Sequence, residues 1–283
     1  MANQLCLGAW KQNIVSVFTF TGESVGPWNT FQPNAYELRI RLFLPLCVVT
    51  ALSTESDRVL SFGIPRIDEA FPGLQRGEFA VLFGHPLCRM LSFLLSVRCQ
   101  LPLKKGGLNS RVVFIDGGNT FDPYAVSAIA QEYGLEPKSV LERIFISRAF
   151  TAYQLTALIF EKLEEALKRY RSKLVIVSDI AGLFLDRDVP KIESRDIFMK
   201  MAHYLSDLAS KRRAVVVASY FPRPYSSRSL FLESVLFGRA TTVIGLKESR
   251  GVLKFVLEDH PSLKPFTIDF PSNAVTIDTF MEA

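Results

Sequence analysis

From residue 60 onward, short apolar runs alternate with longer segments whose apolar residues recur at helical spacing. The runs are apolar at nearly every position, which is typical of strands buried on both faces of a parallel sheet. The spacing of the intervening segments is typical of amphipathic helices. We expect strands at 79–83, 111–115, 143–147, 173–177 and 214–218. We expect helices from about residue 85 to 100 and over 120–133, 151–170 and 194–210.

The pattern changes after Thr241. Two β-prone runs, 242–247 and 252–257, flank Arg250-Gly251, and a further run follows at 266–270. This arrangement predicts an antiparallel hairpin. Alternating strands and helices followed by a hairpin predict an α/β fold: a doubly wound, mostly parallel sheet with right-handed crossovers and a C-terminal antiparallel hairpin.

Residues 1–57 differ from the rest of the chain and are interpreted as an N-terminal extension, separate from a core domain over 58–283. Their longest apolar run, 42–51, contains Pro45 and is too short to span a bilayer. It also lies too far from Met1 for an ordinary signal peptide. We expect a buried strand or docking segment there, and no membrane partner.

Composition restricts the chemistry further. The 283 residues are 48% hydrophobic and 22% charged, which is typical of a globular protein. The net charge of +5 permits a nucleic-acid partner without requiring one. Four cysteines without C-x-x-C spacing and three histidines suggest neither a metal site nor a disulfide framework. We therefore expect reduced, buried cysteines and a cytoplasmic protein.

The segment after the strand 79–83 is arranged like a phosphate-binding strand, loop and helix. That motif reads G-x-x-x-x-G-K-[ST]. Counting from Gly84, the inner Gly is Arg89, the Lys is Met90 and the Ser/Thr is Leu91. The replacements remove a turn that aims N–H groups at phosphate, a positive charge and a hydroxyl for Mg²⁺. Pro86 removes one more N–H.

Four segments resemble, in the same order, segments of the RecA/RadA recombinases of archaea and their paralogues. Residues 60–78 resemble the family's lead-in to the first strand, and 114–121 (FIDGGNTF) resemble its F-I-D-T-E-G-T-F segment. Residues 148–150 resemble its R-A-F, and 258–270 its C-terminal hairpin. The resemblance covers roughly residues 58–280. It implies a RecA-like core, and identifies the chain as an archaeal RadA-like paralogue with degenerate nucleotide motifs.

The resemblance also shows which catalytic groups are absent. The family's catalytic Glu falls on Gly118, and the acid that ends its Walker B strand falls on Ser178. Asp179 stands one place late, on the opposite face unless a bulge intervenes. Phosphoryl transfer needs Mg²⁺, charge and a positioned water together. We therefore expect a pseudo-ATPase with no catalytic residues, no cofactor and no metal.

In the family, loops after the fourth and fifth strands contact DNA, so the resemblance suggests a DNA-binding surface. Here the fifth strand runs into arginines interleaved with aromatic residues, a composition that suits single-stranded DNA. A proline-rich surface loop without DNA is the alternative. The DNA-binding candidates are Tyr220, Arg223, Tyr225 and Arg228.

Two functions remain open at this point. One is a non-catalytic RadA/RecA-like paralogue that assists homologous recombination or DNA repair by binding single-stranded DNA and a RadA-like recombinase or another paralogue. The other is an ATP-dependent DNA-repair ATPase that uses Arg89 and Asp179 in offset registers. A regulatory protein that binds neither DNA nor nucleotide is a third interpretation.

The family's nucleotide-capping D-x-P matches Asp259 and Pro261. Without a nucleotide to cap, we expect no ATP-driven filament.

Overall fold

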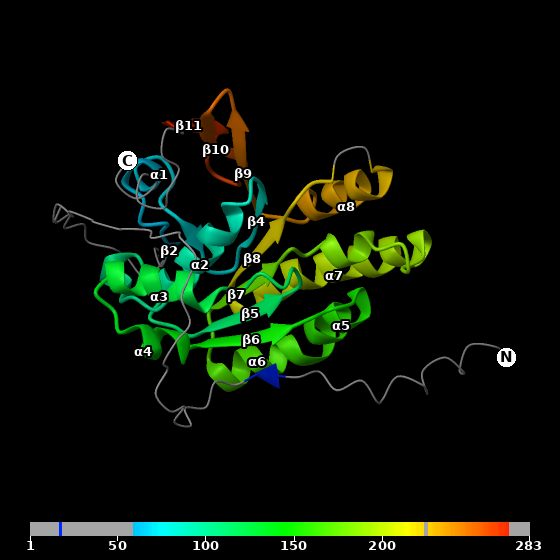
Figure 1. Ribbon diagram of the computed structural model, residues 1–283, viewed down its shortest axis with the longest axis horizontal. Coiled ribbons are helices and arrows are strands. Elements are labelled where there is room, and N and C mark those ends of the chain that lie inside the picture. The colour runs from blue at the N-terminus through cyan, green and yellow to red at the C-terminus, as the bar shows by residue number, and fades with distance from the viewer. Residues whose placement is uncertain (1–16, 19–58, 224–225, 272–283) are drawn as a thin grey trace, which may run out of the picture.

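A computed structural model describes residues 17–18, 59–223 and 226–271 of the chain (Figure 1). Its main feature is a nine-stranded sheet in the order β1-β6-β5-β7-β8-β4-β9-β10-β11. The six strands from β6 to β9 in this order pair in parallel, and β10 and β11 continue the sheet antiparallel. The predicted doubly wound, mostly parallel sheet with a C-terminal antiparallel hairpin is therefore confirmed.

The strands are β1 (Val17–Phe18), β2 (Val59–Leu60), β3 (Leu74–Gln75), β4 (Phe79–Gly84), β5 (Val112–Asp116), β6 (Ile144–Arg148), β7 (Leu174–Ser178), β8 (Val215–Tyr220), β9 (Thr242–Ser249), β10 (Val252–Asp259) and β11 (Phe266–Pro271). The helices are α1 (Pro65–Asp68), α2 (Cys88–Arg98), α3 (Pro123–Glu132), α4 (Pro137–Leu141), α5 (Ala152–Ala157), α6 (Leu163–Tyr170), α7 (Lys191–Arg212) and α8 (Ser227–Phe237), with 3-10 turns η1 (Leu103–Lys105) and η3 (Gly182–Leu185) and the π-helical turn η2 (Leu158–Lys162). Every strand expected in the core lies within two residues of its predicted bounds.

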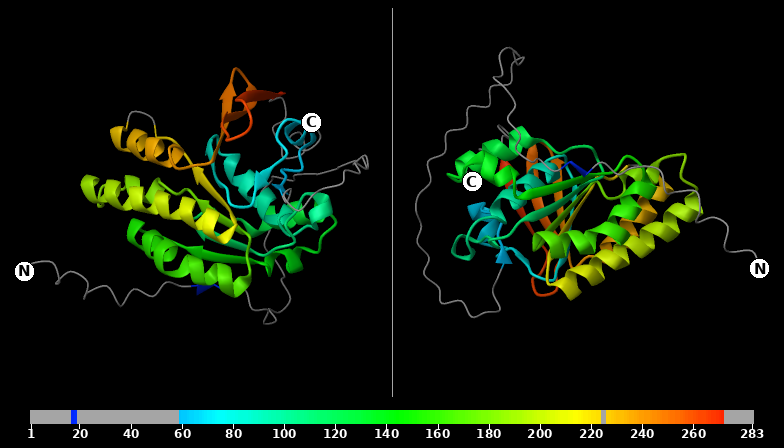
Figure 2. Two further views of the ribbon diagram at one scale, coloured as in Figure 1. Left: turned by 180° about the vertical axis from the view of Figure 1, so that it is seen from behind. Right: turned by 90° about the horizontal axis from the view of Figure 1, so that it is seen from below.

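Helices cover both faces of the sheet (Figure 2). Helices α2, α3 and α4 share one hydrophobic core with one face, and α5 to α8 share a second core with the other. Strand β4 supplies both: Ala80 and Leu82 face the first core, whereas Phe79, Val81 and Phe83 face the second. All five side chains are nearly fully buried. This alternation explains why the strands are apolar at consecutive positions.

Local sequence signals fix where several helices begin. Asp122 accepts hydrogen bonds from the backbone N–H groups of Tyr124 and Ala125, and Pro123 occupies the first turn of α3. Glu136 and Pro137 start α4 in the same way. An acidic cap followed by proline strongly favours the start of a helix. The acidic side chain accepts hydrogen bonds from N–H groups of the first turn, and proline has no N–H group that would need an acceptor.

The expected extension falls largely outside the described residues, and so does the apolar run 42–51. Its one described part, β1, pairs antiparallel with β6, with Val17 opposite Ser147. Cys88 and Cys99 are free and buried, as expected, while Cys6 and Cys47 lie outside the described residues. In the described part of the chain, no helix is both long and apolar enough to cross a membrane.

Candidate functional site

The four central parallel strands end at one edge of the sheet, where ligands usually bind in open α/β folds. Their last residues are Gly84, Asp116, Ser178 and Tyr220, from β4, β5, β7 and β8. Asp116 lies opposite Ser178 in the pairing of β5 with β7. The residues that the sequence assigned to a degenerate nucleotide site thus meet at this edge.

The loop after β4 begins with a tight turn, and the first backbone N–H that could bind a phosphate is already hydrogen-bonded there. Gly84 has φ +102°, and a Cβ there would lie 2.3 Å from the carbonyl oxygen of Leu246. The backbone N–H of His85 donates to that same oxygen at 2.8 Å. Pro86 has no N–H to offer. The first two positions of the loop therefore present no free donor.

The remaining N–H groups of the loop are also engaged within the protein. The N–H of Leu87 donates to the His85 ring nitrogen Nδ1 at 3.3 Å. The N–H groups of Cys88 and Arg89 donate to the carbonyls of His85 and Pro86, both at 3.0 Å. A phosphate-binding loop aims such groups at the ligand. Here they bind acceptors within the loop itself, and no motif in the sequence indicates that the His85 ring takes part.

The side chains at the three replaced positions, 89 to 91, make contacts within the protein. The guanidinium of Arg89 lies over the ring of Phe221, with 5.3 Å from Cζ to the ring centroid. Met90 packs against the first core, and Leu91 is only 2% exposed within it. Neither can supply the ammonium group or the Mg²⁺-binding hydroxyl of the phosphate-binding motif.

Asp116 survives from the family segment but is fully engaged. It is fully buried, and its carboxylate accepts the N–H groups of Thr120 and Phe121 at 2.9 and 3.1 Å. The guanidinium of Arg148 binds it at 3.1 Å. A buried carboxylate held by two N–H groups and a guanidinium fixes the turn after β5. Its role here is to hold that turn.

Gly118 stands where the resemblance places a catalytic Glu. A Cβ there would lie 3.0 Å from the Cβ of Asp179 and 3.2 Å from the Cγ2 of Thr120. The hydroxyl groups of Thr120 and Ser178 hydrogen-bond each other at 2.8 Å. A larger side chain at 118 would have to displace these neighbours.

Asp179 does not join the strand through a bulge. Strand β7 ends in register at Ser178, and Asp179 follows in the left-handed region at φ +47°. Its N–H donates to the hydroxyl of Ser219 at 2.9 Å. Burial raises the pKa of the carboxyl, opposed first by the charge of Arg223, then by a hydrogen bond from the Gly182 N–H and by the charge of Arg89. Arg89 and Asp179, the two residues of the offset pair, therefore lie near each other at this edge of the sheet.

Two of the four DNA-binding candidates are corrected by the structure. Tyr220 is the last residue of β8 and fully buried, and its hydroxyl lies 2.7 Å from that of Ser229. Arg228 lies inside α8, is 9% exposed, and donates to the carbonyls of Asp186 and Val189. Neither side chain is free to contact a base or a phosphate.

The loop that the sequence predicts over residues 220–229 is shorter in the structure, because Ser226 caps α8 by accepting the N–H of Ser229 at 3.2 Å. Arg223 is exposed and keeps its place as a candidate. Its N–H donates to the Ser229 hydroxyl at 3.1 Å. Tyr225 lies outside the described residues.

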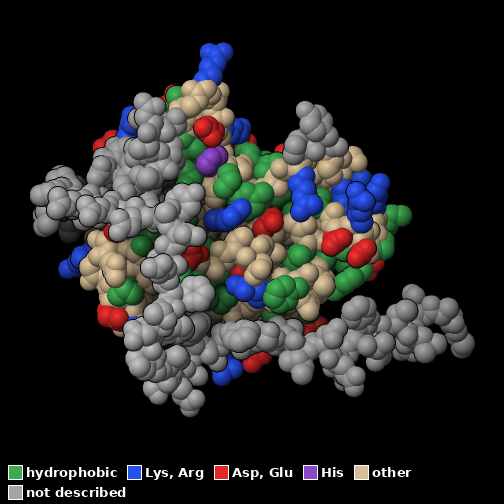
Figure 3. Space-filling model, in the orientation of Figure 1, with side chains coloured by type: hydrophobic (Ala, Val, Ile, Leu, Met, Phe, Trp, Pro, Cys, Tyr) green, Lys and Arg blue, Asp and Glu red, His purple; other side chains and the backbone are tan. Residues whose placement is uncertain are grey.

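Charge on the surface is mixed. On the face in Figure 3, Lys and Arg side chains lie in separate groups, several of them beside Asp or Glu, and form no continuous basic stripe. Among the described residues, no three His, Cys, Asp or Glu side chains are grouped as a metal site would need.

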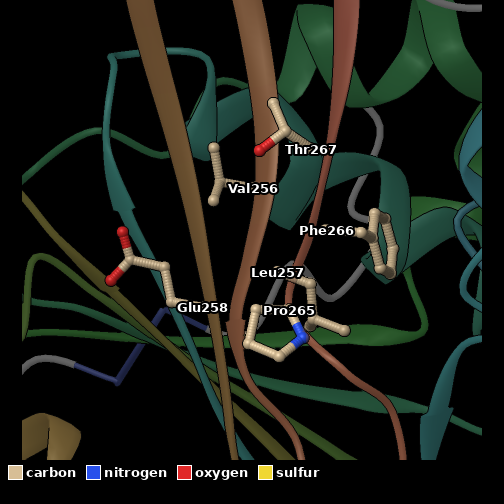
Figure 4. Close-up of a pocket in the computed structure, with 6 residues that line it drawn as sticks. All are labelled: Val256, Leu257, Glu258, Pro265, Phe266 and Thr267. Carbon is tan, nitrogen blue, oxygen red and sulfur yellow. The ribbon is translucent and has the colours of Figure 1, made fainter.

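A surface hollow of about 420 Å³ lies on the C-terminal hairpin (Figure 4). The side chains of Glu258 and Phe266 point in opposite directions there, and Glu258 pairs with Lys247 at 2.5 Å. The hollow carries no cluster of reactive groups. Its lining residues are Val256, Leu257, Glu258, Pro265, Phe266 and Thr267.

Comparison with known proteins agrees with this fold. The family model described as Rad51 matches residues 46–220, more than half of the chain. A "DNA repair protein Rad51 homolog" of Drosophila melanogaster is 31% identical over 157 residues, covering 52% of this chain and 46% of that protein. A "DNA repair protein RAD51 homolog" of Solanum lycopersicum is 30% identical over 143 residues, covering 50% and 39%. The chain thus matches less than half the length of either relative, and it belongs to the Rad51 family.

Proposed function

We propose that this chain is a non-catalytic member of the Rad51 family that acts in homologous recombination or DNA repair. It does so by binding single-stranded DNA and a RadA-like recombinase or another paralogue. The general role rests on family membership and on relatives named as DNA repair proteins. The non-catalytic part rests on this chain's own residues.

The observation that carries the proposal is the closed loop after β4. The N–H groups of His85, Leu87, Cys88 and Arg89 all have acceptors within the protein, and Pro86 has none to give. An incoming phosphate would have to break these bonds before gaining its own. Because Met90 and Leu91 also supply neither charge nor hydroxyl, nothing compensates that cost.

A second candidate, an ATPase with an offset site, is favoured by one observation. Burial raises the pKa of the Asp179 carboxyl, and Arg89 lies close enough for its charge to be one of the effects that oppose this rise. Such a pair could replace the usual lysine and acid if the loop rearranged. Gly118 still leaves no carboxylate to position the attacking water.

Titration calorimetry with Mg-ATP separates the two candidates. We expect no binding heat and no phosphate release from the purified chain. Micromolar affinity that is lost in both Arg89→Ala and Asp179→Asn would establish the offset site and overturn the proposal. Lys104→Ala is the matched control, because Lys104 is an exposed cation in η1, away from this edge.

The partner part of the proposal is tested by pull-down from native extract with and without nuclease. We expect a recombinase of the same family to be recovered in both samples, since a protein contact does not depend on DNA. Recovery only without nuclease would reduce the proposal to DNA binding. Light scattering with ATP should show no long filaments of the chain alone.

A further inference from the structure

Two arginines from separate elements, Arg89 and Arg223, lie near the Asp179 carboxyl, where the loop after β4 lies beside the end of β8. Arg89, in the first turn of α2, lies over the ring of Phe221 at 5.3 Å. Arg223 follows Phe221 by two residues, and its backbone is fixed by the hydrogen bond to Ser229. Both arginine side chains are exposed. Two guanidinium groups at one edge form an attractive position for an anion.

A carboxylate of the protein already lies beside them. Asp179 is held in a left-handed turn by the bond from its N–H to Ser219. A Cβ at Gly182 would lie 2.3 Å from the Asp179 atom Oδ2, and one at Gly118 would lie 3.0 Å from its Cβ. Two glycines therefore leave the space that this side chain fills. Its position is set by packing, and Arg223 and Arg89 both lie near enough for their charges to act on its carboxyl.

We propose that Arg89 and Arg223 form one binding site for a backbone phosphate of single-stranded nucleic acid, and that the Asp179 carboxylate competes with that phosphate. The proposal rests on the proposed DNA binding. It adds a binding residue, Arg89, and an internal competitor, Asp179. The free protein thus carries a substitute anion in its own site.

A phosphodiester fits this site better than a nucleotide does. The engaged N–H groups from His85 to Arg89 offer no cradle for a triphosphate. Two exposed guanidinium groups at an open edge suit one phosphate of a strand that runs across it. The carboxylate lowers affinity by charge repulsion, so a strand should gain most when Asp179 is neutral.

The test is fluorescence anisotropy with a labelled oligothymidylate at low salt, comparing the parent with Asp179→Asn. Asparagine tolerates a left-handed backbone and keeps a side-chain oxygen for the Gly182 N–H. We expect affinity to rise about fivefold, the effect of one charge acting across several ångströms near a protein surface. The gain should vanish in Asp179→Asn combined with Arg89→Ala, and likewise with Arg223→Ala.

Asp188→Asn is the matched control, because it removes one exposed acidic charge from the segment after β7. An equal gain in Asp188→Asn would mean that only net charge matters, and would overturn the proposal. So would a gain that persists without Arg89. Thermal unfolding reports whether each variant is folded. If Asp179→Asn does not fold, Arg89→Ala alone must still weaken binding, and unchanged affinity would overturn the proposal.

Inorganic phosphate distinguishes the possible ligands. If phosphate binds Asp179→Asn as tightly as the oligonucleotide does, the nucleic-acid part of the proposal is wrong. The outcomes also separate the two proposals. A parent that binds DNA with an affinity unchanged in Asp179→Asn retains its proposed function and refutes the competitor. If the parent does not bind DNA but the Asp179→Asn variant does, the proposed function is wrong and the competition by Asp179 is supported.

Discussion

Arg228 reaches from the first turn of α8 to the backbone of Asp186, where its guanidinium donates to the carbonyl oxygen at 2.7 Å. A second bond goes to the carbonyl of Val189. These bonds tie the segment that follows β7 to the segment that follows β8. In the family, these two segments are the expected DNA-contacting loops, so one buried arginine sets their relative position here.

Arg228→Ala should destabilise the protein by about 2–4 kcal/mol, because two carbonyls lose a charged donor and a cavity forms. Urea unfolding measures the loss. Arg223→Ala is the control: it is exposed, and its removal should change stability by less than about 0.5 kcal/mol. Equal effects of the two variants would mean that the tie does not exist in solution.

Restoring the motif residues in the loop after β4 should not restore nucleotide binding. Arg89→Gly, Met90→Lys and Leu91→Thr together restore the motif residues, but the bonds from His85 to Leu246 and from Leu87 to His85 remain. We expect calorimetry to show no Mg-ATP binding by this triple variant. Binding by the triple variant would show that side chains alone, rather than the closed loop, exclude the nucleotide.

Gly84 and Gly77 provide a matched pair for the turn after β4. Their φ angles are +102° and +106°, but only at Gly84 would a Cβ meet backbone, 2.3 Å from the Leu246 carbonyl oxygen. Gly77→Ala carries conformational strain alone, on the order of 1 kcal/mol. Gly84→Ala should cost several kcal/mol more by chemical denaturation. Similar costs would contradict the close approach of β4 to β9.

Asp68 gives the protein a pH-dependent stability. Its carboxylate accepts the N–H groups of Phe62 and Gly63, and burial, partly offset by Arg98, raises its pKa from 3.8 to about 6. The folded protein therefore holds this proton more tightly than the unfolded chain does. The stability contributed by the group is greatest below pH 3.8 and is lost as pH rises to about 6.

The measurement compares the free energy of unfolding of the parent and of Asp68→Asn at several pH values. The parent should lose stability relative to the variant as pH rises from about 4 to 7, by at most about 3 kcal/mol for this shift. Asparagine does not titrate, so other groups cancel in the difference. A difference that is flat with pH would exclude the raised pKa.

The strands and most helices were predictable because their signals are local. Consecutive apolar positions define β4 to β8, and Asp122-Pro123 defines the start of α3. The burial of Arg228 was not predictable, since its acceptors lie about 40 residues away in sequence and become neighbours only in the folded chain. Ser, Arg and Pro in residues 222–229 are typical of a loop, and this composition concealed the first turn of α8.

Arg223 and Arg228 should affect the binding of a DNA strand in different ways. Each phosphate contact to a single strand contributes about 0.7 to the slope of log affinity against log salt. Arg223→Ala should therefore flatten the slope by about that amount, since its side chain is exposed. Arg228→Ala should lower affinity at every salt concentration without changing the slope, because the buried guanidinium binds carbonyls and not phosphate. Lys104→Ala should leave both unchanged. Anisotropy across a salt series measures all three, and a slope flattened equally by Arg228→Ala would mean that Arg228 also contacts a phosphate in the DNA complex.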